Sequence, residues 1–252
     1  MDFLAADWFP LGTFINGVCI LAGGMVGLWL QGQLSAGVQL KFRYFLALLT
    51  VAAAGGMIYK GATDGDAEHG RFLGRFGIVF VALIVGALVG RLLGLQMQLN
   101  KLSAYACARL SKPDNDGKGV SEGFVTCTIL FCVGPMSLVG PIEDGLGKGV
   151  PFALLAKSVM DGVATLALAP RFGWGVMLAV IPVVSLQGTV TLLARSFEQL
   201  LMRNPELIPS ISLTGGMMVM TIVLVILEIR KVPLADYLPA LIVAPLMASW
   251  LL

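Results

Sequence analysis

Charged side chains are scarce in this chain of 252 residues: Lys, Arg, Asp and Glu together make up 13%, against 57% hydrophobic residues. Soluble globular domains carry about a quarter of their residues as charges. The chain therefore lacks the polar surface that keeps a protein of this size in water, and the sequence indicates an integral membrane protein. The net charge of +2 gives no sign of an acidic partner, and no nucleic-acid binding is expected.

Cysteine and histidine are also few. Three of the four cysteines, Cys19, Cys127 and Cys132, lie in apolar runs, which favours packing roles over disulfides or metal ligation. The single histidine, His69, belongs to the loop TDGDAEHG, which offers no protease-like Ser/His pair and no HExxH motif. We expect this loop to be a solvated acidic turn, with a weak cation site as the alternative. The sequence predicts no enzyme, no metal site and no cofactor.

Long runs without charge occupy most of the chain. A hydrocarbon core about 30 Å thick needs roughly 20 helical residues, and no alternation with period two favours a β-barrel. The sequence predicts an all-α fold, a polytopic transmembrane helical bundle of about eight spans, at residues 10–30, 43–60, 76–95, 121–141, 152–170, 173–195, 211–229 and 236–252. The start, MDFLAADWFP, carries acids where a cleaved signal peptide carries Lys or Arg, so the first run is expected to be a retained span.

The distribution of Lys and Arg sets the expected orientation, because cytoplasmic loops carry an excess of both. The loops after spans one, three, five and seven hold ten of the 17: Lys41, Arg43, Arg91, Lys101, Arg109, Lys112, Lys118, Arg171, Arg230 and Lys231. The opposite side holds Lys60, Arg71, Arg75, Lys148, Arg195 and Arg203. Both termini are therefore predicted to lie outside, on the side opposite the cytoplasm. Within the long cytoplasmic loop, Leu95, Leu99, Leu102 and Ala106 share one helical face, as in an interfacial helix.

A single transmembrane domain over residues 1–252 is expected to contain an internal repeat. Ala82–Val85 followed by GALVG matches Ala240–Val243 followed by APLMA, and Asn16-Gly17 matches Gln187-Gly188 in the same order. Spans one to three would then correspond to spans six to eight, and the odd offset makes the repeat inverted, as in many secondary transporters. Chance likeness among Gly/Ala-rich helices is an equal alternative. The units are residues 10–95 and 173–252, with an interfacial linker at 96–120 and central spans at 121–170.

Span four contains Gly134-Pro135 near its middle. Proline removes a backbone donor and clashes with the preceding turn, so this helix is expected to kink or to break. A break at membrane depth must face protein or a wet cavity, which Thr126, Thr128 and Ser137 would line unless their hydroxyls bond their own helix. At the outer end, Glu143 and Asp144 are expected to form a solvated turn, with a cation vestibule as the alternative.

Span five carries Lys157 and Asp161, the two charges predicted to be buried at depth. Their spacing of four residues places them on one helical face, where each neutralises the other. The pair is either a structural ion pair that lets the helix insert, or a site in which the carboxylate takes part in cation or proton transport with the lysine as a competing internal cation. Asn16 and Gln187, at matching points of the two repeats, would meet Asp161 at the pseudo-two-fold axis, or else form ordinary contacts between helices.

The motifs GTFING, GFVTCTILFCVGPMSLVG, EDG, AKSVMDG, QGTVTLLA and LPALIVAPL, in this order, resemble a bacterial inner-membrane family of unknown function that includes YqgA and YdfK. The resemblance covers nearly the whole chain and implies a polytopic, transporter-like protein without an established substrate. Pro135 and Arg91 depart from the family pattern. The matching motif positions are Asn16, Gly134, Asp144, Lys157, Asp161, Gln187 and Gly188.

Three functions are compatible with these patterns. The first is a secondary transporter of a small solute or ion, coupled to sodium or protons, with a midplane site near the broken span four and span five. The candidate site residues are Asp161, Lys157, Asn16, Gln187, Gly134, Thr128, Ser137 and Asp144. A passive channel and a non-transporting membrane scaffold or assembly protein are the alternatives. The bilayer is the expected partner, and the Gly-rich helices allow a homo-oligomer.

Overall fold

The structure, a computed structural model, describes residues 10–30, 35–63, 69–98, 100–101, 105, 118–132, 134–146, 152–204, 206–230 and 232–252. These residues form helices joined by short turns, and no strand occurs among them. The elements are α1 (Leu11–Trp29), α2 (Ala36–Thr63), α3 (His69–Leu93), α5 (Lys118–Cys132), α6 (Met136–Gly145), α7 (Phe152–Phe172), η1 (Gly173–Ala179), α8 (Val180–Ser196), α9 (Glu198–Arg203), α10 (Leu207–Ile226), η2 (Leu234–Tyr237) and α11 (Ala240–Leu251). The predicted all-α class is confirmed.

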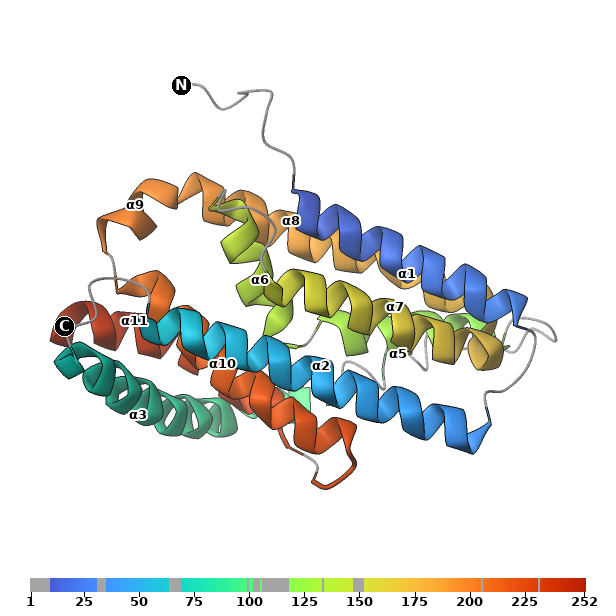
Figure 1. The fold of residues 1–252 in the computed structure, drawn as a ribbon, viewed down its shortest axis with the longest axis horizontal. Coiled ribbons are helices and arrows are strands. Elements are labelled where there is room, and N and C mark those ends of the chain that lie inside the picture. The colour runs from blue at the N-terminus through green and yellow to red at the C-terminus, as the bar shows by residue number, and fades with distance from the viewer. Residues whose placement is uncertain are drawn as a thin grey trace.

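Six helical stretches of the described chain are long and apolar enough to cross a membrane, or seven if the bent pair α5–α6 counts as one span. One of the six, Phe152–Ser196, has 45 residues and contains the fifth and the sixth predicted spans. Figure 1 shows that the chain runs along α7, turns at the short helix η1 and returns along α8, so that α7 and α8 are antiparallel. This stretch is therefore a helical hairpin.

Two long helix pairs organise the bundle: α1 packs along α7, and α2 packs along α10 (Figure 1). Glycine permits the closest approach between α1 and α7, since a Cβ at Gly23 would overlap the carbonyl oxygen of Gly162. Close backbone approach at small residues is the usual way in which helices associate in lipid, where the hydrophobic effect between helices is absent. The α1–α7 pair consequently holds Asn16 and Asp161 side by side.

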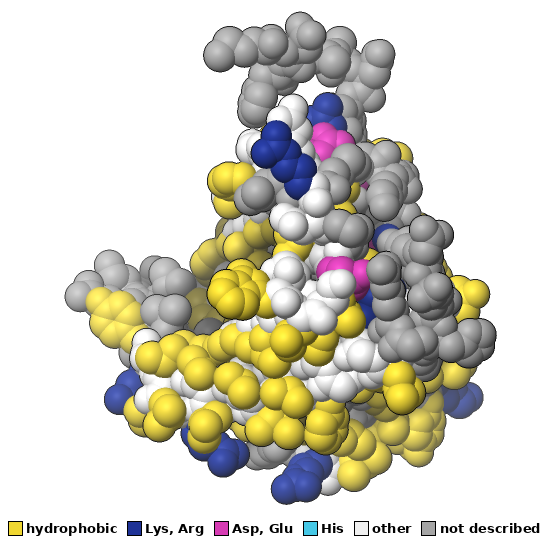
Figure 2. Space-filling model, turned by 90° about the vertical axis from the view of Figure 1, so that its left-hand side faces the viewer, with side chains coloured by type: hydrophobic (Ala, Val, Ile, Leu, Met, Phe, Trp, Pro, Cys, Tyr) yellow, Lys and Arg dark blue, Asp and Glu magenta, His cyan; other side chains and the backbone are white. Residues whose placement is uncertain are grey.

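Apolar side chains lie both inside and outside the bundle. One buried cluster contains Ile20, Phe131, Phe172 and Val176, drawn from α1, α5, α7 and η1. Large apolar side chains such as Trp29, Leu92 and Ile242 are exposed. Figure 2 shows a broad apolar area on one face, with Lys and Arg side chains at its margin. A surface of this kind is expected to contact lipid.

Candidate functional site

Span four is broken rather than kinked. Helix α5 ends at Cys132 and α6 begins at Met136, with Gly134-Pro135 between them, and the two helices are bent by 62°. The break leaves the carbonyl oxygen of Phe131 without its helical partner. Two side chains satisfy this oxygen instead: Ser137 Oγ donates to it at 2.6 Å and Lys157 Nζ at 2.8 Å. A cation at the carboxyl end of a helix is also favoured by the helix dipole.

Lys157 and Asp161 form the ion pair that their spacing predicts. Nζ of Lys157 lies 2.7 Å from Oδ2 and 3.1 Å from Oδ1 of Asp161. Both residues are buried, at 5% and 6% exposure. Because an isolated charge inside a membrane protein is costly, the ammonium group is stabilised by the carboxylate and by the Phe131 carbonyl together.

Asn16 joins the ion pair to the second half of the chain. Its Nδ2 donates to Oδ2 of Asp161 at 3.1 Å and to Oε1 of Gln187 at 3.2 Å. Asn16 and Gln187 are fully buried, on α1 and α8 respectively. Of the two residues expected to meet Asp161, Asn16 contacts it directly, and Gln187 contacts Asn16. One polar network runs from the broken helix through α7 and α1 to α8.

A pocket of about 170 Å³ borders this network, and Gly134, Lys157 and Asp161 line it. The rest of its wall is apolar and is formed by Leu46, Leu130, Phe131, Met136, Met160, Ala164, Ile222 and Ile226. A ligand here must be smaller than drug-sized molecules, whose sites measure about 300–1,000 Å³.

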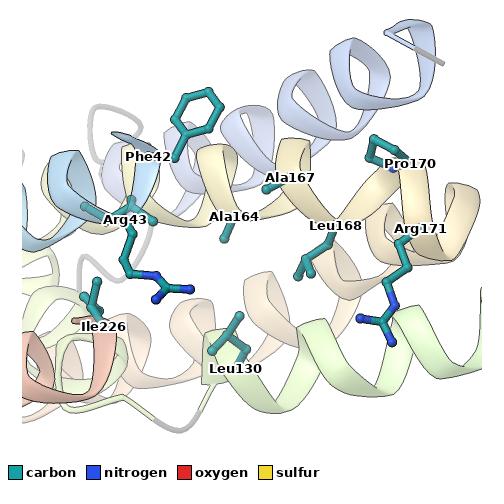
Figure 3. Close-up of a pocket in the computed structure, with 10 residues that line it drawn as sticks. Phe42, Arg43, Leu130, Ala164, Ala167, Leu168, Pro170, Arg171 and Ile226 are labelled. Atoms are coloured by element: carbon teal, nitrogen blue, oxygen red, sulfur yellow. The ribbon is translucent and has the colours of Figure 1, made fainter. Parts of the chain in front are cut away.

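A larger pocket of about 550 Å³ adjoins the first and shares Leu46, Leu130, Ala164 and Ile226 with it. Figure 3 shows Arg43 and Arg171 at its two sides, with both guanidinium groups extending toward its interior. Arg43 pairs at 2.7 Å with Glu228, an exposed contact that water screens. No ion pair of Arg171 occurs among the described residues. The approach to Lys157 is therefore positively charged.

The prediction of a solvated turn at Glu143 and Asp144 is wrong. Helix α6 continues through both residues, and their side chains are buried, at 6% and 5% exposure. Glu143 accepts a hydrogen bond from Ser212 at 2.8 Å and pairs with Lys60 at 3.1 Å. Asp144 lies instead against the first turn of α1, where the Gly12 N–H donates to its Oδ1 at 3.4 Å. Asp144 is thus buried but separate from the Lys157–Asp161 pair.

Some of the remaining candidate residues lie beside the Lys157–Asp161 pair, and others do not. Gly134 and Ser137 belong to the break beside Lys157. The Thr128 hydroxyl is buried on α5 without a hydrogen-bond partner, and Thr128 does not line either pocket. Residues 64–68 of the acidic loop, and Leu99, Leu102 and Ala106 of the predicted interfacial helix, lie outside the described residues. No group of three or more His, Cys, Asp or Glu able to hold a metal occurs in the described part.

Sequence reasoning missed a second buried ion pair. Arg75 of α3 donates to Glu206 through Nε at 2.7 Å and through Nη2 at 2.8 Å, and both residues are buried. The hydropathy of the sequence predicts that Arg75 lies in the loop before span three, because a charge next to a long apolar run usually marks the end of a membrane span. Its partner is 131 residues away, so no local spacing could have revealed the pair.

Comparison with known proteins places this architecture in a family. The model of the family described as "Protein of unknown function (DUF554)" matches residues 11–249. The chain belongs to this family. It is 30% identical over 235 residues to the "Uncharacterized membrane protein YdfK" of Bacillus subtilis (strain 168), covering 93% of each chain. It is 26% identical over 243 residues to the "Uncharacterized protein YqgA" of Escherichia coli (strain K12), covering 95% of this chain and 97% of that protein. No solved structure matches. The resemblance inferred from the motifs is confirmed.

Proposed function

We propose that this DUF554 protein is a secondary transporter of a small anionic solute in the bacterial inner membrane. The observation that carries the proposal is the position of the Lys157–Asp161 pair, which is buried at the end of a broken helix and faces a pocket. Broken helices with ionisable side chains at membrane depth are typical of transporter sites. A pair needed only for insertion would not require a break or a pocket beside it.

The inverted repeat is supported by reciprocal packing between α3 and α11. In the predicted match, Ala82 corresponds to Ala240 and Gly86 to Ala244. Gly86 packs closely on Ala240, while Ala82 and Ala244 belong to one buried cluster. Two units related by a two-fold axis make contacts in such exchanged pairs.

The central spans follow the same pattern. Each contains an Asp-Gly pair, Asp144-Gly145 in α6 and Asp161-Gly162 in α7. Gly145 packs on the Thr191 carbonyl of α8, and Gly162 packs on the Cys19 carbonyl of α1. Helices α1 and α8 are the first helices of the two proposed units, so these contacts are equivalent under the exchange. Counting α5–α6 as one crossing and α7 and α8 as two gives the proposed eight spans.

The charges along the two pockets favour an anion. The walls of these two pockets contain three basic side chains and one acidic side chain: Arg43, Arg171 and Lys157 against Asp161. Within low-dielectric walls, an excess of positive charge raises the local concentration of anions. The other lining residues are almost all apolar, so the solute is expected to combine one anionic group with a small apolar body, as a short carboxylate does.

Proteoliposomes test the proposal directly. Currents on a solid-supported membrane and the signal of an internal pH dye are recorded together, so that both electrogenic and proton-coupled electroneutral transport are detected. Small carboxylates, inorganic anions, amino acids and cations are screened under sodium and proton gradients. We expect carboxylate-dependent signals that Asp161→Asn abolishes. Glu122→Gln, which removes an exposed carboxylate of α5, is the matched control and should behave as the wild type.

Two results would contradict a carrier. A steady conductance that does not saturate with solute concentration would indicate a passive channel. Folded wild-type protein that is silent with every solute, together with an Asp161→Asn variant that is less stable than the wild type, would indicate a scaffold in which the pair serves insertion.

A further inference from the structure

Five buried polar side-chain atoms without a hydrogen-bond partner lie where α1, α6 and α8 meet: Thr13 Oγ1, Asn16 Oδ1, Asp144 Oδ2, Gln187 Nε2 and Thr191 Oγ1. These three helices contact one another pairwise. Each of the five residues is at most 5% exposed. Buried polar atoms in native proteins are nearly always satisfied, so a group of them in one interface indicates a bound species.

The contacts between the helices place these residues within about one turn of one another in the interface of α1, α6 and α8. Asp144 faces the backbone of Gly12 and Thr13 in α1. The next residue, Gly145, packs on the Thr191 carbonyl of α8. Asn16, one turn beyond Gly12, donates to Gln187, one turn before Thr191. The four unpartnered oxygens form no hydrogen bonds with one another, as expected of ligands that surround an ion.

The charge of this group is not balanced by side chains. Of the four other buried carboxylates, three have a basic partner: Glu143 has Lys60, Glu206 has Arg75, and Asp161 has Lys157. The fourth, Asp236, accepts a hydrogen bond from the Gln96 N–H at 2.9 Å. No lysine or arginine in the described chain pairs with Asp144. Its 3.4 Å contact with the Gly12 N–H at the start of α1 offsets only part of a buried negative charge.

We propose that Asp144, Thr13, Asn16 and Thr191 form a site for a monovalent cation, with sodium as the expected ion. One carboxylate with hydroxyl and amide oxygens supplies a single negative charge, which a monovalent ion neutralises and a divalent ion exceeds. Hard cations prefer such oxygen ligands. A proton on Asp144 would neutralise the carboxylate but would leave the other three oxygens unsatisfied.

If the protein is the transporter proposed above, this cation site is its coupling-ion site; that role rests on the proposed function. Asn16 belongs to both groups, since its Nδ2 holds Asp161 and Gln187 and its Oδ1 is one of the unpartnered oxygens. Binding of sodium at Oδ1 would orient this amide and fix the acceptor geometry at Asp161. The two sites are therefore coupled through a single side chain, which is the physical requirement for co-transport.

Thermal unfolding of the purified protein in NaCl, KCl and choline chloride, at equal ionic strength and fixed pH, tests the site without a transported solute. We expect a Tm that rises with sodium concentration in the wild type. Thr191→Val should weaken the apparent sodium affinity about tenfold or more, since it removes one oxygen that contacts a charge. Thr189→Val is the matched control, because this threonine is exposed on the same helix and donates to the Ser185 carbonyl. Asp144→Asn should abolish the effect.

The outcomes separate the two proposals. Equal Tm values in the three salts, or an unchanged sodium effect in Thr13→Val and Thr191→Val, would overturn the cation site. A Tm that responds to pH and not to sodium would assign a proton to Asp144 and would also overturn it. If sodium stabilises the protein but no solute is transported, the site stands and the proposed function fails. If a solute is transported but sodium does not stabilise the protein, the proposed function stands and the cation site fails.

Discussion

Lys157 has two partners of different kinds, a backbone carbonyl freed by a broken helix and a carboxylate one turn away. Each is needed for a different reason. The carbonyl of Phe131 gives the ammonium a hydrogen-bond acceptor, whereas Asp161 gives it a counter-charge. Removing one member of a buried ion pair is costly because it leaves the other charge uncompensated, and removing both is often nearly neutral. Stability and transport can therefore be separated at this pair.

Single and double neutralisation of the pair should differ in a defined way. Lys157→Met and Asp161→Asn should each lower the free energy of unfolding by about 3–5 kcal/mol. The double variant should recover most of that loss and still fail to transport. Unfolding in mixed micelles and uptake by proteoliposomes are the two measurements. A double variant that transports as the wild type does would show that the pair has no part in solute binding.

The sequence predicted the Lys157–Asp161 pair because the two partners are four residues apart on one helix, where geometry alone brings them together. Asn16 and Gln187 were singled out because they occupy matching positions in the proposed repeat, a comparison that relates distant segments without a structure. Asp144 could not be placed in this way. Its burial depends on the continuation of α6 past Pro141 and on the approach of α1, and an acidic pair next to a proline is usually a turn at the surface.

At the scale of the helix, small residues decide which pairs of helices approach closely. A Cβ at Gly23 of α1 would overlap the carbonyl oxygen of Gly162 in α7, while nothing lies within 4 Å of one at Gly55 in α2. Glycine is frequent throughout the chain, with 31 residues, so composition predicts close packing in general and cannot select the positions where it occurs. Only the arrangement of the helices distinguishes Gly23 from Gly55.

A matched pair of substitutions tests this packing. Gly23→Ala should lower the free energy of unfolding by about 1–3 kcal/mol, because the added methyl group pushes α1 away from the α7 backbone. It should also weaken transport, since Asn16 and Asp161 lie across the same interface at 3.1 Å. Gly55→Ala should be neutral in both assays. Thermal unfolding and uptake of the two variants decide the matter, and equal behaviour of the two variants would mean that α1 and α7 tolerate separation.

On the scale of the whole molecule, the charged pairs other than Lys157–Asp161 are divided between the two ends of the bundle. Arg43 and Glu228 pair where α2 begins and α10 has ended. Lys60–Glu143 and Arg75–Glu206 lie at the opposite ends of these helices. The pocket with Arg171 belongs to the first end, which the excess of Lys and Arg predicts to be cytoplasmic. In this conformation the Lys157–Asp161 pair is therefore expected to be reached from the cytoplasm.

Reporter fusions can test the eight proposed spans and the orientation together, since alkaline phosphatase is active only outside the inner membrane and green fluorescent protein is bright only inside. A fusion after Leu252 should have phosphatase activity and no fluorescence, whereas an odd number of spans from an outside start would reverse both signals. Fusions at Gly173 and Arg203 should lie inside and outside respectively, because α7 and α8 cross in opposite directions (Figure 1). If both fusions reported the same side, α8 would not cross the membrane, and the inverted relation between the two units would be lost.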